Sequence, residues 1–327
     1  MAGVQDAHLA IAVSQAGALG SLPAAMLDAS SLERQLRLLQ AAGRPYNVNF
    51  FVHEMPAHDA TREAHWLTLL APYYAELGLD PAQPASGASR QPFGPEAAEV
   101  LESFSPPVVS FHFGLPAPDL LARVKRMGSR VLSSATTVRE GLWLQAQGAD
   151  AVIAQGLEAG GHRGHFLDKD VTLQTTTANL LSLMVGALDI PVIAAGGIAD
   201  AAGVRAAMAQ GASAVQVGTA FLLCDEARTS ALHRAALRDA QAPTALTNLF
   251  TGGLARGIVN RVMREHGPIH EAAPPFPLAT GPIAALRARA EALACTDFSP
   301  LWSGTNRSGC RASPAAEVVR ALAKGLV

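Results

Sequence analysis

The sequence predicts an α/β protein with the fold of a (β/α)8 TIM barrel and a small helical cap. Short apolar runs alternate with helically spaced stretches from residue 7 to residue 221, which is typical of a parallel sheet whose strands are joined by helices. Two successive units, Pro191–Asp200 and Ala214–Phe221, place glycines directly after a strand, as the last two units of a phosphate-binding barrel do. Beyond Cys224 the strand pattern stops and helical spacing continues, which indicates a separate helical part.

Seven strands are expected from runs of β-branched, aromatic and small apolar residues. They lie in the two glycine-containing units and at 18–22, 46–51, 108–113, 131–134 and 151–154. Helices are expected where apolar residues recur every three or four positions, as Leu32, Leu36 and Leu39 do. They lie at 7–15, 31–42, 60–77, 119–127, 137–147 and 172–186.

A barrel of this class has eight strands, and the first is apparently missing from this chain. Residues 1–4 have the character of a loop that ends a strand, and the helical pattern of 7–15 follows directly. An open barrel would expose two strand edges without partners. We therefore expect either a strand upstream of Met1 or another segment that closes the gap.

Three parts are predicted along the chain. Residues 1–228 form the barrel, 229–297 a helical cap and substrate domain, and 298–327 a C-terminal segment that returns to the barrel. The helices of the last two parts are expected at 229–240, 258–266, 283–293 and 314–326. The Pro- and Gly-rich stretch 79–95 predicts a long surface loop that acts as a lid, because loops of this length are usually functional.

Composition and charge exclude several classes of function. The formal net charge is −2 and no block of lysines and arginines occurs, which argues against nucleic acid or an anionic membrane as a partner. The three cysteines have no metal-ligand spacing, and an odd, sparse set is typical of the reducing cytosol. No apolar run is long enough to span a bilayer. We expect a cytoplasmic protein without a metal, and the oligomeric state is left open.

The two glycine-containing turns predict a phosphate site. Backbone N–H groups of Gly196, Gly197, Gly218 and Thr219 can approach phosphate oxygens closely, and a short helix start adds partial positive charge. Such a site needs no lysine. The alternative is a pair of ordinary parallel strands with tight turns, but two such turns one βα unit apart favour the phosphate site.

Four polar side chains at or near strand ends are candidates for chemistry, since the carboxyl ends of barrel strands carry the active site. Asn49 and His112 end two strands, and each has the alternative of an ordinary structural role. His162 lies in the loop 155–164, whose glycines leave its imidazole open to a flat ligand. Gln216 precedes the second glycine turn, where its amide can reach a bound cofactor ring.

A phosphate site beside an open histidine loop suggests a mononucleotide that lies across the barrel mouth. Flavin mononucleotide (FMN) fits better than a sugar phosphate, because the amides of Asn49, Gln155 and Gln216 suit the donors and acceptors of an isoalloxazine ring. None of the named loops contains a lysine that could form a Schiff base. The predicted barrel is therefore an FMN-binding domain.

Five stretches carry a resemblance to a known family. They are Gln155–Gly164, Ser110–Pro116, Ala194–Asp200, Thr251–Glu265 and Leu301–Gly304. In them the chain resembles the class I nitronate monooxygenases, formerly called 2-nitropropane dioxygenases. The resemblance covers nearly the whole chain; the first two stretches are specific together, whereas the third is shared by many flavin barrels.

This resemblance implies an FMN-dependent enzyme that needs no metal and no added reductant. It implies that O2 oxidises alkyl nitronates, which are small anions such as propionate 3-nitronate, to a carbonyl compound and nitrite or related nitrogen oxides. His112 and His162 are implied to line the substrate site, with His162 as general base if a neutral nitroalkane is also used. The implied FMN contacts are Asn49, Gln155, Gly160, Gly197, Gln216, Val217, Gly218 and Thr219.

Two other functions stay open at this point. An FMN-dependent enoyl-thioester reductase or NADH:quinone reductase of the same superfamily shares the barrel and a comparable histidine loop, but Arg163 and the strand Ser110–Phe113 favour a nitronate. From a different class, an inactive barrel could bind a phosphorylated ligand. In the cap, residues 274–282 lack the tyrosines that some family members place near substrate, which predicts a drift in specificity.

Overall fold

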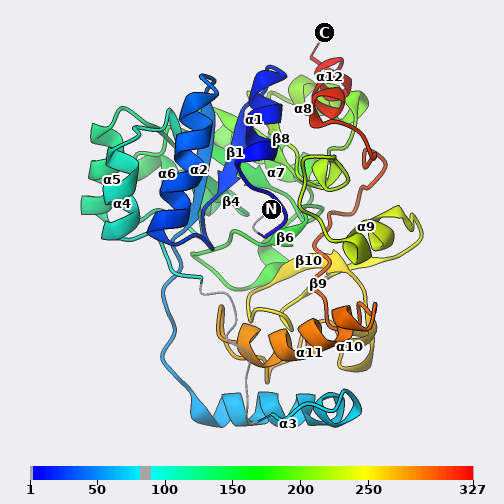
Figure 1. The fold of residues 1–327 in the computed structure, drawn as a ribbon. Helices are drawn as coiled ribbons and strands as arrows, with labels where there is room; N and C mark the ends of the chain where they lie inside the picture. Colours follow the sequence, from blue (N-terminus) through cyan, green and yellow to red (C-terminus); the bar gives the residue numbers. More distant parts are fainter. Residues whose placement is uncertain (1–2, 82–89, 327) are drawn as a thin grey trace.

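The computed structural model describes residues 3–81 and 90–326, which form two layers (Figure 1). A curled parallel sheet with surrounding helices makes the larger layer, and a short antiparallel sheet with further helices lies at one end of it. Met1 and Ala2 of the predicted strand-end loop, and residues 82–89 of the predicted loop 79–95, lie outside the described residues.

The seven predicted strands all form, in the sheet order β1-β2-β3-β4-β5-β7-β8, and all neighbours are parallel. Their bounds are Gly20–Pro23 (β1), Tyr46–Phe51 (β2), Val108–His112 (β3), Arg130–Ala135 (β4), Ala151–Gln155 (β5), Val192–Ala195 (β7) and Ala214–Gln216 (β8). β5 is buried along its whole length, because helices cover one side of the sheet and side chains fill the other. The predicted TIM-barrel class is confirmed.

Helices pack around the outside of the sheet, and side-chain caps begin several of them: Asp28, Thr137, Thr176 and Asp200 each accept from a backbone N–H of the first turn. The bounds are Ala7–Gln15 (α1), Ala29–Ala41 (α2), Pro95–Glu102 (α4), Pro118–Arg126 (α5), Val138–Ala146 (α6), Thr177–Ala187 (α7), Ala201–Ala209 (α8) and Ala315–Ala323 (α12). Two short 3-10 turns, η1 (Val171–Leu173) and η2 (Thr219–Phe221), interrupt the loops. The helix expected at 172–186 therefore starts later, at Thr177.

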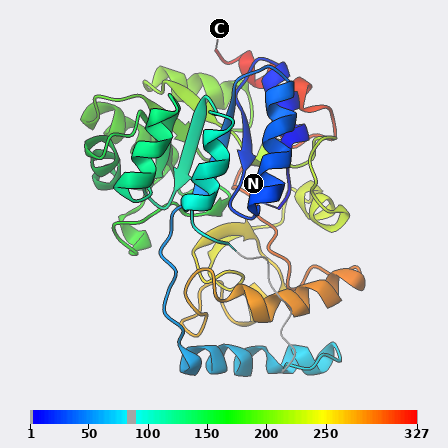
Figure 2. The ribbon, with the colours of Figure 1, turned by 60° about the vertical axis from the view of Figure 1, so that its left-hand side comes forward.

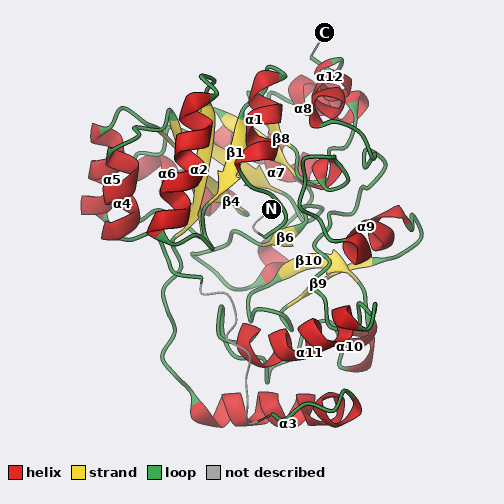
Figure 3. Cartoon of the chain, in the orientation of Figure 1, coloured by secondary structure: helices red, strands yellow, loops and turns green. Residues whose placement is uncertain are grey.

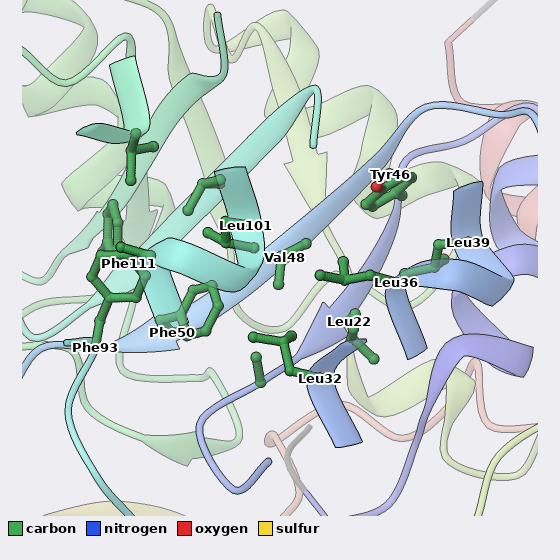
Figure 4. Close-up of a cluster of buried hydrophobic side chains, with 14 of the residues drawn as sticks. Leu22, Leu32, Leu36, Leu39, Tyr46, Val48, Phe50, Phe93, Leu101 and Phe111 are labelled. Atoms are coloured by element: carbon green, nitrogen blue, oxygen red, sulfur yellow. The ribbon is translucent and has the colours of Figure 1, made fainter. Parts of the chain in front are cut away.

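The core on the side of α2 and α4 shows how the helices hold the sheet (Figure 4). Leu32 and Leu36 of α2 and Leu101 of α4 pack on Val48 and Phe50 of β2, and all five side chains are almost fully buried. Burial of apolar surface of this kind contributes roughly 25 cal/mol per Å². This contact fixes β2 and its neighbour β3, which ends at His112. Asn49 does not end its strand as expected, because β2 continues through Phe51, where it still pairs with β3.

The seam between β8 and β1 is covered by helices. Among the described residues no ladder joins the two strands, and Ala214 and Gln216 of β8 are exposed. Side chains of α1, α8, α12 and η2 form one apolar cluster here, which includes Leu9, Phe221 and Val319. α12 lies beside α1 and α8 at this seam (Figure 1).

Helix α3 (Ala60–Glu76) lies in the second layer, although its sequence falls within the predicted barrel segment 1–228 (Figure 2). Its buried Trp66, Leu70 and Tyr74 pack in one cluster with Ile283 and Leu286 of α11 (Thr280–Ala292). The barrel position after β2 is taken by α4, which lies between α2 and α5 and was not expected from the sequence. An amphipathic pattern predicts a helix but does not reveal which surface will cover its apolar face.

The cap contains strands as well as helices, which corrects the expectation of a purely helical part (Figure 3). A three-stranded antiparallel sheet is formed by β6 (Gly161–His162), β10 (Ala255–Ile258) and β9 (Thr244–Thr247). The helices near it are α9 (Ala231–Arg238), α10 (Arg261–Glu265) and α11. The helix expected at 258–266 is shorter because Ile258 ends β10 and Asn260 caps α10. The division at residues 228 and 297 stays a prediction.

No helix in the described part of the chain combines the length and the apolar content that a membrane span requires.

Gly20 is a stringent test of the packing of α1 on β1. A methyl group added at Gly20 would overlap the backbone carbonyl of Ala10, whereas one added at Gly186 in α7 would meet no atom within 4 Å. We expect Gly20→Ala to lower the melting temperature, since overpacking costs typically ~1–3 kcal/mol. The matched control Gly186→Ala should leave it unchanged or raise it, because alanine favours a helix over glycine by roughly 0.5–1 kcal/mol. Equal melting temperatures for the two variants would contradict this packing.

Candidate active site

The histidine loop is held between the barrel and the cap. His162 belongs to β6, which pairs with β10 so that His162 lies opposite Ala255. The backbone N–H of Arg163 continues this pairing and donates to the carbonyl of Leu254 at 2.8 Å. The loop that follows β5 is thus the outer strand of the cap sheet.

Two predicted site residues of the barrel fix the same loop. Gln155, at the end of β5, donates from Nε2 to the carbonyl oxygen of His162 at 2.9 Å, and His112, at the end of β3, lies with Nε2 at 3.1 Å from that oxygen. Gln155 Oε1 also accepts from the backbone N–H of Gly164 at 2.7 Å. The structure therefore brings Gln155, His112 and His162 into one hydrogen-bonded network.

His112 has a partner for each ring nitrogen. Nδ1 lies 3.0 Å from Ser134 Oγ, and Nε2 faces the carbonyl of His162. Burial lowers the pKa of His112 to about 3. His112 is accordingly a neutral side chain whose hydrogen bonds orient the loop. Phe113 follows it at φ 72°, a backbone conformation that non-glycine residues seldom adopt and that is found at functional sites.

The ring of His162 has one engaged and one unengaged nitrogen. Nε2 lies 2.9 Å from Thr251 Oγ1, and the Thr251 hydroxyl is placed to donate to the carbonyl of Gly253 at 3.4 Å. This arrangement favours the tautomer in which Nε2 carries the proton and Nδ1 is an acceptor. The hydrogen bond of the ring to a described residue is the one at Nε2.

Aromatic rings surround the His162 imidazole, and we call them the aromatic cluster: Phe51, Phe113, Phe276 and Trp302. Their ring centroids lie 6.0, 6.3, 5.0 and 5.5 Å from that of His162. Burial lowers the pKa of His162 well below its usual value, and the positive charge of Arg90 acts in the same direction. The imidazole is therefore neutral, and its protonated form needs an anion beside it.

Arg163 is turned inward. Its side chain is completely buried, and its guanidinium donates to the carbonyls of Gly156 and Gln155 at 2.6 and 2.7 Å and to Gln174 Oε1 at 2.8 Å. Burial lowers its pKa to about 10. Arg163 thus supports the backbone of the loop from behind.

The two glycine turns lie side by side, because β7 and β8 pair with Ala195 opposite Gln216. Gly196 and Gly197 have φ of 124° and 71°, which L-residues with side chains rarely adopt. The backbone N–H groups of Gly197 and Gly218 make no hydrogen bond to a described residue. Glu158 lies beside Gly197, but its Oε2 accepts from the N–H and hydroxyl of Thr177 at 2.8 Å.

A C-terminal stretch, residues 302–310, lies along both turns. Asn306 donates from Nδ2 to the carbonyl of Gly197 at 2.9 Å, and the N–H of Gly304 donates to Thr219 Oγ1 at 2.9 Å. Gly160 packs so tightly on this stretch that an added methyl group would overlap the backbone of Gly304. A close approach of two backbones therefore requires glycine at position 160.

Two of the predicted cofactor residues lie apart from the histidine network. Asn49 donates from Nδ2 to Ser110 Oγ at 2.9 Å, and the Gln216 side chain is exposed. The sequence analysis did not single out Thr251, although it begins one of the family-like stretches. It also missed Asn306, for which the sequence carries no evident signal.

The fold is an α/β barrel whose histidine loop is completed by the strands of a cap. The model of the family described as "Nitronate monooxygenase" matches residues 1–325. The chain is 40% identical to a nitronate monooxygenase of Pseudomonas aeruginosa over 332 aligned positions, which cover 100% of this chain and 94% of that protein. It is 38% identical to one of Paraburkholderia phytofirmans, with 100% and 90% covered. The chain belongs to the nitronate monooxygenase family and is an oxidoreductase.

Solved structures agree with this assignment. A nitroalkane oxidase from Streptomyces ansochromogenes has a TM-score of 0.89 and 38% sequence identity, over 100% of this chain and 93% of that one. FabK from Thermotoga maritima has a TM-score of 0.73 at 24% identity, over 99% and 90% of the two chains. The second likeness shows a common fold. Family membership supports the oxidation of nitronates.

Buried neutral histidines predict how stability depends on pH. His233 is also buried, with Nε2 3.2 Å from the carbonyl of Trp302, and burial lowers its pKa to about 4. Between pH 6.5 and 4 the unfolded chain binds protons at His112 and His233 that the folded chain does not, so stability falls as pH falls and is level above pH 7.

Melting temperatures measured from pH 8 to 5.5 should therefore decline only below about pH 7, near the ordinary histidine pKa. His233→Gln, which leaves both site histidines in place, should make the decline shallower. A melting temperature that rises as the pH falls over this range would contradict the assignment.

Proposed function

We propose that this enzyme binds FMN and uses O2 to oxidise an alkyl nitronate to a carbonyl compound and nitrite or related nitrogen oxides. The observation that carries the proposal is the neutral imidazole of His162, whose Nδ1 has no hydrogen-bond partner among the described residues and lies beside the aromatic cluster. It lies at the carboxyl ends of the barrel strands, where barrel enzymes have their active sites. Membership in the nitronate monooxygenase family supports the same reaction.

The chain around the glycine turns fits a phosphate group. The N–H groups of Gly197 and Gly218 have no acceptor among the described residues, and no side chain of these glycines blocks a ligand. Gly196 and Thr219 would complete the phosphate contacts. Gln155 keeps a second N–H on Nε2 after its bond to the His162 carbonyl, so it can still donate to a flavin ring. The other residues proposed to contact FMN are Asn49, Gly160, Gln216 and Val217.

When bound, FMN would supply the electron-transfer chemistry of the oxidation, with O2 as the terminal oxidant and the source of the oxygen added to the substrate. The role proposed for His162 is to accept a proton from the substrate. Its unprotonated Nδ1 can take the α-proton of a neutral nitroalkane, which converts the substrate to its nitronate. The imidazolium that forms then pairs with the anion, and the opposite charges stabilise each other in the low-dielectric surroundings of the aromatic cluster.

Flavin retention tests the phosphate site. Gly197→Asp would bring a carboxylate to the place proposed for the phosphate, so we expect the purified protein to lose most of its FMN. Gly197→Asn is the matched control, because asparagine has nearly the same shape, tolerates a positive φ and carries no charge. It should retain clearly more flavin in the visible spectrum. Equal flavin content in the two variants would show that the phosphate does not bind at this turn.

Turnover tests the histidine. His162→Asn should keep a yellow protein but lower the rate of nitroalkane oxidation by about 10²–10⁴-fold, the usual loss when a general base is removed. Thr251→Val, which removes the partner of Nε2, should give a smaller loss in the same assay because both tautomers then become available. Oxygen uptake within a few-fold of the parent protein in His162→Asn would show that another group acts as base.

A further inference from the structure

A second histidine lies against the aromatic cluster. His53 follows β2, and its ring centroid is 4.7 Å from that of Phe276, 6.1 Å from Phe113 and 6.4 Å from Phe51. These are three of the four rings that surround His162. His53 and His162 therefore approach one group of phenylalanines, and Phe276 meets both imidazoles edge-on.

Within the described residues, no side chain makes a hydrogen bond with the ring nitrogens of His53. Nδ1 and Nε2 are both buried, and neither makes a hydrogen bond of normal geometry to a described residue. Burial lowers the pKa of His53, while a backbone group of Arg90 approaches the ring and acts in the opposite direction. Buried polar groups in proteins are nearly always hydrogen-bonded, so an imidazole approached only by the Arg90 backbone has a nitrogen that is suited to a ligand.

Arg90 supplies a positive charge at the same place. Its positive charge lowers the pKa of both His53 and His162. It is partly buried and donates from Nη1 to Thr280 Oγ1 at 2.9 Å. Within residues 3–81 and 90–326, no carboxylate forms an ion pair with it, and the charged group that acts on its own pKa is another cation, Arg287.

Removing a guanidinium from water without pairing it with a carboxylate costs free energy. A bound anion offsets that desolvation cost. We propose that Arg90 and His53 form an anion subsite separate from the reacting centre at His162, and that this subsite binds a carboxylate carried by the substrate. The inference rests on the proposed oxidation of a nitronate. It gives the substrate two polar ends, with the nitronate at His162 and the carboxylate at Arg90, and a short apolar chain along Phe276.

Steady-state kinetics with two substrates tests the subsite. Propionate 3-nitronate carries a carboxylate and ethyl nitronate does not, but both have the same reacting group. We expect Arg90→Met to raise the KM for propionate 3-nitronate by about 10- to 100-fold, the worth of one charge-assisted hydrogen bond, with little change for ethyl nitronate. Arg90→Lys should restore part of the difference, and His53→Phe should shift the ratio in the same direction.

The matched control is Arg287→Met. Arg287 is a neighbouring cation on α11 that pairs with Glu291, and its loss should leave the ratio of the two KM values unchanged. An equal rise in both KM values for Arg90→Met would mean that Arg90 binds the nitronate group itself or that it only stabilises the fold. An unchanged ratio would mean that it contacts no substrate. Either result overturns the proposal.

A binding measurement separates this proposal from the proposed reaction. Succinate, a carboxylate that cannot be oxidised here, is titrated by calorimetry into the protein as purified. We expect it to bind the parent protein and Arg287→Met, and to bind Arg90→Met at least 10-fold more weakly. If neither nitronate is oxidised but succinate binding depends on Arg90, the reaction is wrong and the subsite stands. If both nitronates are oxidised but succinate binding does not depend on Arg90, the subsite is wrong.

Discussion

The carbonyl oxygen of His162 is the point on which the active site depends. It faces Gln155 Nε2 from β5 and His112 Nε2 from β3, while the adjacent backbone pairs with β10 of the cap. A two-residue strand has little stability of its own, so its position is set by these three neighbours. The imidazole orientation, the contact with Thr251 and the approach of the aromatic cluster all follow from that one fixed peptide.

Much of the barrel can be predicted from the sequence because its signals are local. Residues 151–154 are apolar throughout and 46–51 are apolar apart from Asn47 and Asn49, as strands covered on both faces tend to be, and the pair Gly196-Gly197 marks the turn after β7. Gln155, His112 and His162 can be chosen as candidates because strand ends in a barrel converge. Their roles toward cofactor and substrate stay predictions.

The remaining features depend on contacts between residues far apart in the chain. The position of α3 in the cap depends on α11, and β6 exists because β10 offers it a partner. Neither glycine nor histidine in β6 favours a strand by itself. His53 looks like an ordinary loop residue in the sequence, and only the fold brings it to the phenylalanines that also contact His162.

The stretch 302–310 has a consequence for the order in which the molecule matures. The proposed phosphate cradle is made by peptides near residues 197 and 219 and is braced by Gly304 and Asn306. On the ribosome, the glycine turns emerge well before this brace is synthesised. The cradle therefore remains unbraced while the segment between residues 219 and 304 is synthesised, and tight cofactor capture has to wait for the brace.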